Sequence, residues 1–338
     1  VTTAGMSGKV MADEESVIGA TVVAVHEPSG TSYGTVTNVD GRFSLQGMRS
    51  GGPYKVTVSY IGYQTAIYTD IQLQLGETYS LNVTLHEASE LLGEITITAS
   101  KSKFSAEKTG ATTNISSEQL TTLPSINRSI SDFTRISPYA SGNSFGGRDG
   151  RSNTFTVDGA NLNNNFGLSS GLPGGGNPIS LDAIDEVQVV IAPYDVRQAN
   201  FIGAGINAIT KSGTNAYRGS AYMYFNNEVM RGNKIGDTDF GVRAEESKTV
   251  YGATFGGPII KDKLFFFANV EYEKSPQQVI TWRAAKEGET PNNSTISRTT
   301  EADLAEFSQI LKDKYGYNTG SFTDFPADVT NLKLLGRI

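Results

Sequence analysis

The segment LFFFANVEYE, residues Leu264–Glu273, is the most informative part of this chain. Successive side chains of a strand point to opposite faces. As a strand, the segment is apolar along one face and turns from apolar to acidic along the other: Leu264, Phe266, Ala268, Val270 and Tyr272 lie opposite Phe265, Phe267, Asn269, Glu271 and Glu273. This pattern suits a β-barrel wall between lipid and a hydrated interior, and it also suits an amphipathic edge of a soluble sheet. The segment alone leaves both interpretations open.

Three further segments alternate in the same way: Gly219–Asn226, Val250–Gly256 and Asn331–Ile338. Their connections are long over residues 227–249, short over 257–263 and very long over 274–330. Barrels of the outer membrane have short periplasmic turns and long outer loops, so this order fits a first strand that rises from the periplasm. Residues 216–338 are therefore predicted to begin a transmembrane β-barrel in contact with outer-membrane lipid. The barrel is expected to be incomplete in this chain, because so few strands cannot close on themselves.

The long connection before the last of these segments contains a helix pattern. Thr300 with Asp303 can cap a helix in which Leu304, Phe307, Leu311 and Tyr315 share one face and which ends at Gly316. We expect this helix to pack on an outer loop, and no chemistry is assigned to it.

The composition favours strands. The 338 residues include 37 Gly, 16 Phe and 15 Tyr against 11 Pro, a mixture typical of many short strands and tight turns. Cysteine is absent, which excludes disulfides, Cys-based zinc sites and thiol nucleophiles within these residues. The net charge of -7 and the lack of a basic run argue against nucleic acid as a partner. No run of about 18 apolar residues occurs, so any membrane crossing would be made by strands.

Residues 1–88 are predicted to form a small β-sandwich. Short segments rich in β-formers are separated by Gly, Asp and Pro: Thr21–Val25, Phe43–Leu45, Tyr54–Tyr60 and Leu81–Leu85. Asp40-Gly41 is expected to form a tight hairpin between Thr37 and Phe43.

This region resembles the carboxypeptidase regulatory-like domain, which has a transthyretin-like fold. The resemblance rests on Gly8–Val10, Ile18–Val22, Thr37–Phe43 and Tyr60–Tyr63. Domains of this kind stand in front of outer-membrane receptors and also follow zinc carboxypeptidases. The chain has only His26 and His86, and neither belongs to a zinc-ligand pattern or stands near a nucleophile motif. We therefore predict no metal site, no catalytic residue, no cofactor and no enzyme.

Residues 89–103 contain the segment EITITA, Glu94–Ala99, followed by a polar run. It is either a last strand of the sandwich or an unpaired strand that binds a partner through its main chain. The segment is similar to the TonB box of energised receptors. That resemblance implies binding of the TonB C-terminal domain by strand addition, through Glu94, Ile95, Thr96, Ile97, Thr98 and Ala99.

Residues 104–215 are predicted to form a small α/β domain. A helix is expected over Ser117–Leu123, ended by Pro124, and a second over Ser129–Ile136. The strands are expected at Asn153–Val157, Val187–Ile191 and Gly205–Thr210.

The segment Asn161–Pro178 of this domain is rich in Asn and Gly. It is either an ordinary surface loop or a ligand-facing apex. In the second case Asn163, Asn164 and Asn165 offer paired donors and acceptors, and Phe166 offers a flat apolar face.

The same domain resembles the plug of TonB-dependent outer-membrane receptors, in particular the Oar-like branch. The resemblance rests on Leu123–Ser129, Gly147–Asn153 with Asp158-Gly159, Pro193–Arg197 and Asn207–Asn215, and it continues at Gly256–Ile259 and Lys261–Phe267. It implies a plug inside a barrel of about 22 strands. It also implies a ligand near Arg148, Asp149 and the apex residues Asn163–Phe166, although Arg148 or Arg151 can instead pair with the barrel.

Together these observations predict a mainly β chain with a transthyretin-like β-sandwich, a small α/β plug and the first strands of a transmembrane β-barrel. The resemblance implies TonB-dependent uptake across the bacterial outer membrane, with the N-terminal domain in the periplasm. The ligand is unknown and is expected to be an oligosaccharide, a peptide or a protein. The alternative is a surface adhesin or structural binding module without transport.

Overall fold

A computed structural model describes the chain except for residues 13, 88–94, 99–110, 126–127, 164–176, 194, 197, 231, 233, 240–246, 279–281, 293–295, 323–325 and 328. The described part is mainly β, with little helix. It divides into two compact units. The first contains residues 1–220, 254–270 and 333–338, and the second contains residues 221–253 and 271–332.

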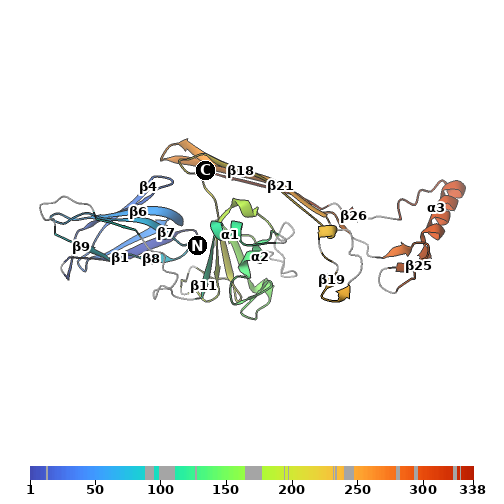
Figure 1. Cartoon of the computed structure of the whole chain (residues 1–338), viewed down its shortest axis with the longest axis horizontal. Coiled ribbons are helices and arrows are strands. Elements are labelled where there is room, and N and C mark those ends of the chain that lie inside the picture. Colours follow the sequence, from blue (N-terminus) through green and yellow to red (C-terminus); the bar gives the residue numbers. More distant parts are fainter. Residues whose placement is uncertain are drawn as a thin grey trace. The chain divides into compact units, whose positions relative to one another are not determined.

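The first unit begins with a β-sandwich, drawn in blue in Figure 1. In one sheet, β1 (Ala4–Ala12) pairs with β2 (Glu15–Ser16), β5 (Arg42–Met48), β8 (Thr78–Ser80) and β9 (Val83–Leu85). The other sheet has the order β10-β7-β6-β3-β4, with β3 (Thr21–His26), β4 (Thr31–Val36), β6 (Gly51–Ser59), β7 (Ala66–Leu73) and β10 (Ile95–Thr98). Fully buried side chains such as Met6, Val22, Tyr54 and Ile71 fill the space between the sheets.

The predicted hairpin at Asp40-Gly41 is wrong. The turn exists, since Gly41 donates from its N–H to the carbonyl of Asn38 and has a φ of 70°. However, the strand before the turn, β4, pairs with β3, whereas the strand after it, β5, pairs with β1 in the other sheet. The turn therefore carries the chain from one sheet to the other. Local turn chemistry predicts a reversal of direction and does not determine which strands then pair.

The plug-like domain of the first unit is built on a five-stranded sheet. Its order is β11-β16-β17-β14-β15, with β11 (Thr112–Ser116), β14 (Thr154–Val157), β15 (Ala160–Asn161), β16 (Ile184–Val190) and β17 (Gly205–Thr210). The two predicted helices are present as α1 (Ser117–Thr122) and α2 (Ile130–Thr134), and each begins with a capping box, at Ser116 and at Ser129. One face of the sheet and α2 enclose an apolar core that includes Ile115, Phe133, Phe155, Val187 and Val189.

The alternating segments form a four-stranded sheet in the order β18-β21-β22-β27. The strands are β18 (Arg218–Asn227), β21 (Ser247–Ile260), β22 (Leu264–Lys274) and β27 (Thr330–Arg337), and Figure 1 draws β18 and β21 as long ribbons. Only Lys261–Lys263 separates β21 from β22, and Asp262 takes a φ of 61° in that turn. The predicted sequence of long, short and long connections is confirmed.

The second unit also contains the last long connection, between β22 and β27. The predicted helix is present as α3 (Glu301–Tyr315), drawn in red in Figure 1. The side chain of Thr300 accepts a hydrogen bond from the N–H of Asp303, and Gly316 closes the helix with a φ of 64°. The shorter strands of this unit are β19 (Lys234–Ile235), β20 (Thr238–Asp239), β23 (Gln277–Gln278), β24 (Arg283–Ala285), β25 (Ile296–Thr300) and β26 (Pro326–Ala327).

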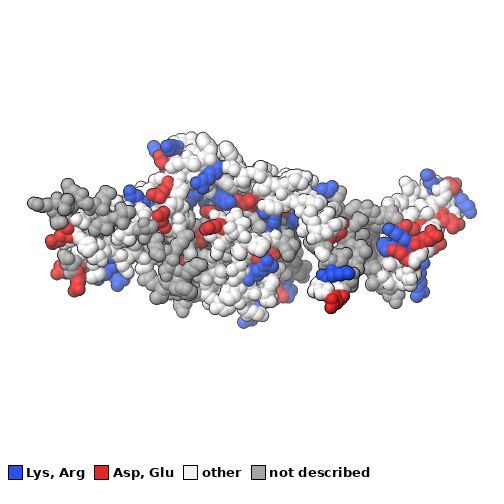
Figure 2. Space-filling model, viewed as in Figure 1, with Lys and Arg blue, Asp and Glu red and all other residues white. Residues whose placement is uncertain are grey.

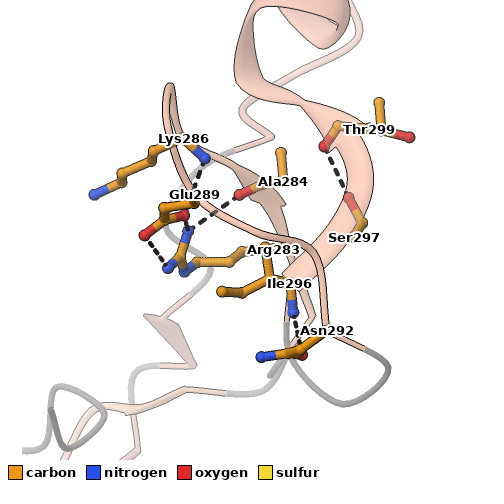
Figure 3. Close-up of polar contacts among 8 residues, drawn as sticks. All are labelled: Arg283, Ala284, Lys286, Glu289, Asn292, Ile296, Ser297 and Thr299. Carbon is orange, nitrogen blue, oxygen red and sulfur yellow. Dashed lines mark hydrogen bonds and ion pairs between the residues drawn. The ribbon is translucent and has the colours of Figure 1, made fainter. Parts of the chain in front are cut away.

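A local network stabilises the segment that leads into α3 (Figure 3). The guanidinium of Arg283 donates to both carboxylate oxygens of Glu289, at 2.5 and 2.7 Å, and the N–H of Lys286 donates to the same carboxylate at 3.0 Å. Hydrogen bonds from Arg283 lower the pKa of Glu289 to about 2. This network orders a turn by contacts between residues close in sequence, and we assign no binding role to it.

Candidate functional site

In the second half of β22 and in the middle of β27, polar side chains are buried and the apolar side chains next to them are exposed. On β22, Asn269 and Glu271 are each only 4% exposed, whereas Val270 is 43% exposed and Tyr272 41%. On β27, Lys333 is 7% exposed between Leu332 at 60% and Leu334 at 71%. A strand in a water-soluble domain shows the opposite distribution. Figure 2 shows few charged side chains along β18 and β21 on the face that it draws.

Contacts on each face support this division. On the covered face, the hydroxyl of Tyr222 donates to Glu271 at 2.8 Å, and Lys248 forms an ion pair with Glu273 at 2.7 Å. On the exposed face, the ring of Phe255 lies 6.1 Å from that of Tyr217 and 5.6 Å from that of Phe266. One face is thus hydrogen-bonded and charged, and the other is aromatic.

The segment predicted to bind TonB is partly described. Glu94 and Ala99 lie outside the described residues. Ile95–Thr98 forms β10, which pairs in parallel with the first half of β7 and stands at the end of its sheet. Of the two alternatives that the sequence leaves open, the structure therefore shows the last strand of the sandwich, because β10 extends the sandwich sheet.

The predicted ligand-facing residues do not form one cluster in the described part of the plug-like domain. Arg148 and Asp149 are exposed on a loop, where Asp149 caps a short 3-10 helix at Gly150–Ser152 and forms an ion pair with Arg151 at 2.9 Å. Asn164, Asn165 and Phe166 lie outside the described residues.

Asn163 uses its side chain to hold a neighbouring strand. Its Oδ1 accepts a hydrogen bond from the N–H of Phe155 at 2.6 Å, and its Nδ2 lies 3.4 Å from the carbonyl of Asn153. A ligand that bound the amide would have to replace these bonds. The geometry therefore supports an anchoring role for Asn163 beside β14.

Sequence reasoning missed a polar clamp between the sandwich and the plug-like sheet. Leu75, in the turn after β7, is fully buried, and its N–H donates to both carboxylate oxygens of Glu186 at 3.0 and 3.1 Å. Gln188 donates from Nε2 to the carbonyl of Leu75 at 2.6 Å, and Asn114 donates to the same carbonyl at 3.3 Å. Burial raises the pKa of Glu186 to about 7. Both main-chain polar groups of Leu75 are therefore held by side chains from β16 and β11 of the plug-like sheet.

A second missed contact joins β27 to the plug-like domain. Arg337 donates to the carbonyl of Thr210 at 2.7 Å and forms an ion pair with Asp158 at 3.4 Å. Asp158 also accepts hydrogen bonds from the N–H and the hydroxyl of Thr210. The sequence offers Arg148 or Arg151 for an ion pair between the plug and the barrel, and it gives no signal for Arg337.

His26 lies beside a serine inside the sandwich. Its Nδ1 is 2.7 Å from the hydroxyl of Ser29, its ring packs on Tyr54, and burial lowers its pKa to about 4. Ser29 has no exposed surface, so a substrate cannot reach its hydroxyl in this fold. We interpret the pair as a structural contact of the sandwich.

The described residues contain no group of three or more His, Cys, Asp or Glu side chains arranged to hold a metal ion. In the same part of the chain, no helix has both the length and the apolar character needed to cross a bilayer.

Comparisons with known proteins agree with this arrangement. The family described as "Carboxypeptidase regulatory-like domain" matches residues 5–86, and the family described as "Outer membrane beta barrel domain" matches residues 209–322. The chain is 26% identical over 252 residues to the "TonB-dependent transporter Oar" of Myxococcus xanthus. The match covers 69% of this chain and 23% of Oar, so the chain spans about a quarter of that relative.

Two solved structures overlap in part. The siderophore receptor PirA from Acinetobacter baumannii is 24% identical, with a TM-score of 0.39, over 49% of this chain and 24% of PirA. PirA from Pseudomonas aeruginosa is 19% identical, with a TM-score of 0.38, over 50% of this chain and 28% of PirA. The relatives named here are transporters or receptors and not enzymes.

Proposed function

We propose that this chain, which belongs to the Oar-like TonB-dependent receptors of the outer membrane and carries a carboxypeptidase regulatory-like domain, acts in active uptake of a ligand across that membrane. In this proposal residues 1–88 are the periplasmic sandwich, 89–103 the TonB box and its linker, 104–215 the plug, and 216–338 the first part of the barrel wall. The ligand class stays open among oligosaccharide, peptide and protein.

The single observation that carries the proposal is the inverted burial of the four-stranded sheet. Asn269, Glu271 and Lys333 are covered, while Val270 and Leu334 face outward. Exposing such a row of apolar side chains to water is unfavourable, at about 25 cal/mol per Å² of apolar surface. Contact with lipid removes this cost, and a hydrated barrel interior accommodates the polar face.

Plug and wall are proposed to move relative to each other only when the contacts between them are broken. The bonds of Arg337 to Asp158 and Thr210 are of this kind, and Phe267 and Leu335 pack against the plug core. In the proposal, TonB pulls on Glu94–Ala99, and part of the plug yields and opens a path.

Arg148, Asp149 and the apex residues Asn163–Phe166 are proposed to face the ligand side of the plug. The exposure of Arg148 and Asp149 supports this placement. For Asn163 the proposed role is to position the apex, because its amide already holds residues 153–155.

Proline substitutions in β10 test the TonB-binding segment. Adjacent residues of a strand direct their main-chain groups to opposite edges, so Thr96→Pro and Ile97→Pro, made separately, each remove a donor from a different edge. We expect at least one of them to weaken binding of the purified TonB C-terminal domain to the full-length receptor by about tenfold or more.

The matched control is Ile61→Pro. Ile61 is 94% exposed and is the second residue of a turn closed by a bond from Tyr63 to Tyr60, with Gly62 at a φ of 86°. Proline is favoured at this position of such a turn, so the control should bind like the parent. A parent receptor that does not bind TonB would contradict the proposal and favour an adhesin or scaffold.

A further inference from the structure

The strand β10 is already ordered by the sandwich. Ile95, Thr96, Ile97 and Thr98 are opposite Ala66, Ile67, Tyr68 and Thr69 in a parallel pairing. On β7, Ala66 is 3% exposed, Ile67 5% and Tyr68 8%. On β10, Ile97 is 41% exposed. The strand thus has one side on a packed sheet and the other directed away from it.

Among the described residues, no strand pairs with the edge of β10 that faces away from β7, here called the outer edge. The sheet ends at β10, and no described strand joins it from the other side. In a strand, the main-chain N–H and C=O groups of successive residues point to opposite edges. Pairing with β7 therefore uses only half of the hydrogen-bonding groups of β10, and the other half faces outward.

We propose that the sandwich serves as a template for the TonB box: it holds Ile95–Thr98 as a preformed edge strand, and the strand of TonB adds to the outer edge while the inner edge stays on β7. This inference rests on the proposed function, because it takes the TonB C-terminal domain as the partner. It assigns a role to the carboxypeptidase regulatory-like domain, which transport alone does not explain.

Two physical arguments favour a TonB strand that adds to the outer edge of β10 over one that displaces β7 from its inner edge. A TonB strand that displaced β7 would exchange one set of main-chain hydrogen bonds for another and would uncover Ile67 and Tyr68. A TonB strand that adds to the outer edge forms main-chain hydrogen bonds without breaking those between β10 and β7. It also leaves the side chains of β7 covered. In addition, a segment already held in the extended conformation loses less conformational entropy on binding than a free segment does.

A disulfide between β10 and β7 distinguishes addition to the outer edge from displacement of β7. Thr69 and Thr98 are register partners on neighbouring strands, a spacing that suits a disulfide, and the 338 residues contain no cysteine. The full-length receptor with Thr69→Cys and Thr98→Cys is prepared oxidised and reduced, and its affinity for the TonB C-terminal domain is measured in both states. The template model predicts that the two affinities agree within about threefold.

The contrary result is a loss of about tenfold or more on oxidation that is restored by reductant, which would show that β10 must leave β7 before TonB binds. Failure of the pair to cross-link would also overturn the inference, since β10 would then not rest on β7. Thr35→Cys with Thr98→Cys is the matched control, because Thr35 lies on β4 at the opposite end of the same sheet and should not cross-link. Absence of TonB binding in both redox states and in the parent would instead refute the proposed function, and the cross-linking result would still report the pairing.

Discussion

At the scale of single residues, Glu186 is a buried carboxyl group with a raised pKa. It is 7% exposed, it accepts two hydrogen bonds from the N–H of Leu75, and Asp185 and Glu77 add negative charge nearby. Burial raises its pKa from 4.5 to about 7. A shift of this size corresponds to roughly 3 kcal/mol in favour of the protonated form. The clamp on Leu75 therefore depends on the protonation state of one side chain.

The direction of this dependence follows from linkage. Because the pKa of Glu186 is raised in the docked state, its contribution is fully present below pH 4.5 and is lost as the pH rises through about 7. We expect the hydrogen-exchange protection of the Leu75 amide to fall between pH 5 and pH 8, after correction for the intrinsic exchange rate.

Glu186→Gln should remove this fall, because Gln keeps an acceptor for the N–H of Leu75 and does not titrate. Glu118→Gln, at an exposed position of α1, is the control and should behave like the parent. Equal pH dependence in all three proteins would show that Glu186 does not control the clamp.

At the scale of elements, the turn between β7 and β8 joins the sandwich to the plug-like sheet. Gly76 follows Leu75 in this turn with a φ of 70°, and a Cβ added there would lie 2.5 Å from Nε2 of Gln188. Gly76→Ala should therefore separate the turn from the sheet and raise amide exchange at Leu75 and along β16 by about tenfold or more.

Gly47→Ala is a matched control for the backbone strain alone. Gly47 has nearly the same φ, 71°, but an added Cβ there meets no atom within 4 Å. The control should lose a comparable amount of local stability in the sandwich and leave β16 protected. Similar exchange in β16 for both variants would mean that the turn does not hold the sheet.

The elements differ in how well the sequence predicts them. The alternation of β22 and the capped helix α3 depend on residues close in sequence, and both are confirmed. The clamp joins residues 111 and 113 positions apart, and the bonds of Arg337 to Thr210 span 127. No period or motif encodes such pairs, because a long-range partner depends on how whole elements pack. For the same reason the predicted hairpin at Asp40-Gly41 is wrong, and the sequence leaves open whether Glu94–Ala99 is a last strand of the sandwich or an unpaired strand.

At the scale of the whole molecule, we propose a division of labour among the sandwich, the plug-like domain and the four-stranded sheet. In the proposal the sandwich presents the TonB box on β10. In the structure the plug-like sheet is clamped to the sandwich through Leu75, and β27 is bonded to the plug-like domain through Arg337. These contacts lie within the first compact unit, where the route from TonB to the plug is proposed to run. The residues proposed to face the ligand are the least predictable part, since a sequence rich in Asn and Gly carries no period from which a strand or a helix follows.

The central claim is that the four-stranded sheet is a wall with lipid on one side. Depth-sensitive fluorescence tests it most directly: single cysteines at residues 268 to 273 of the full-length receptor, each carrying a fluorophore, are measured in vesicles whose lipids bear a nitroxide quencher. We predict quenching with a period of two, strong at Ala268, Val270 and Tyr272 and weak at Asn269, Glu271 and Glu273. Uniformly weak quenching along β22, or quenching without alternation, would contradict the account.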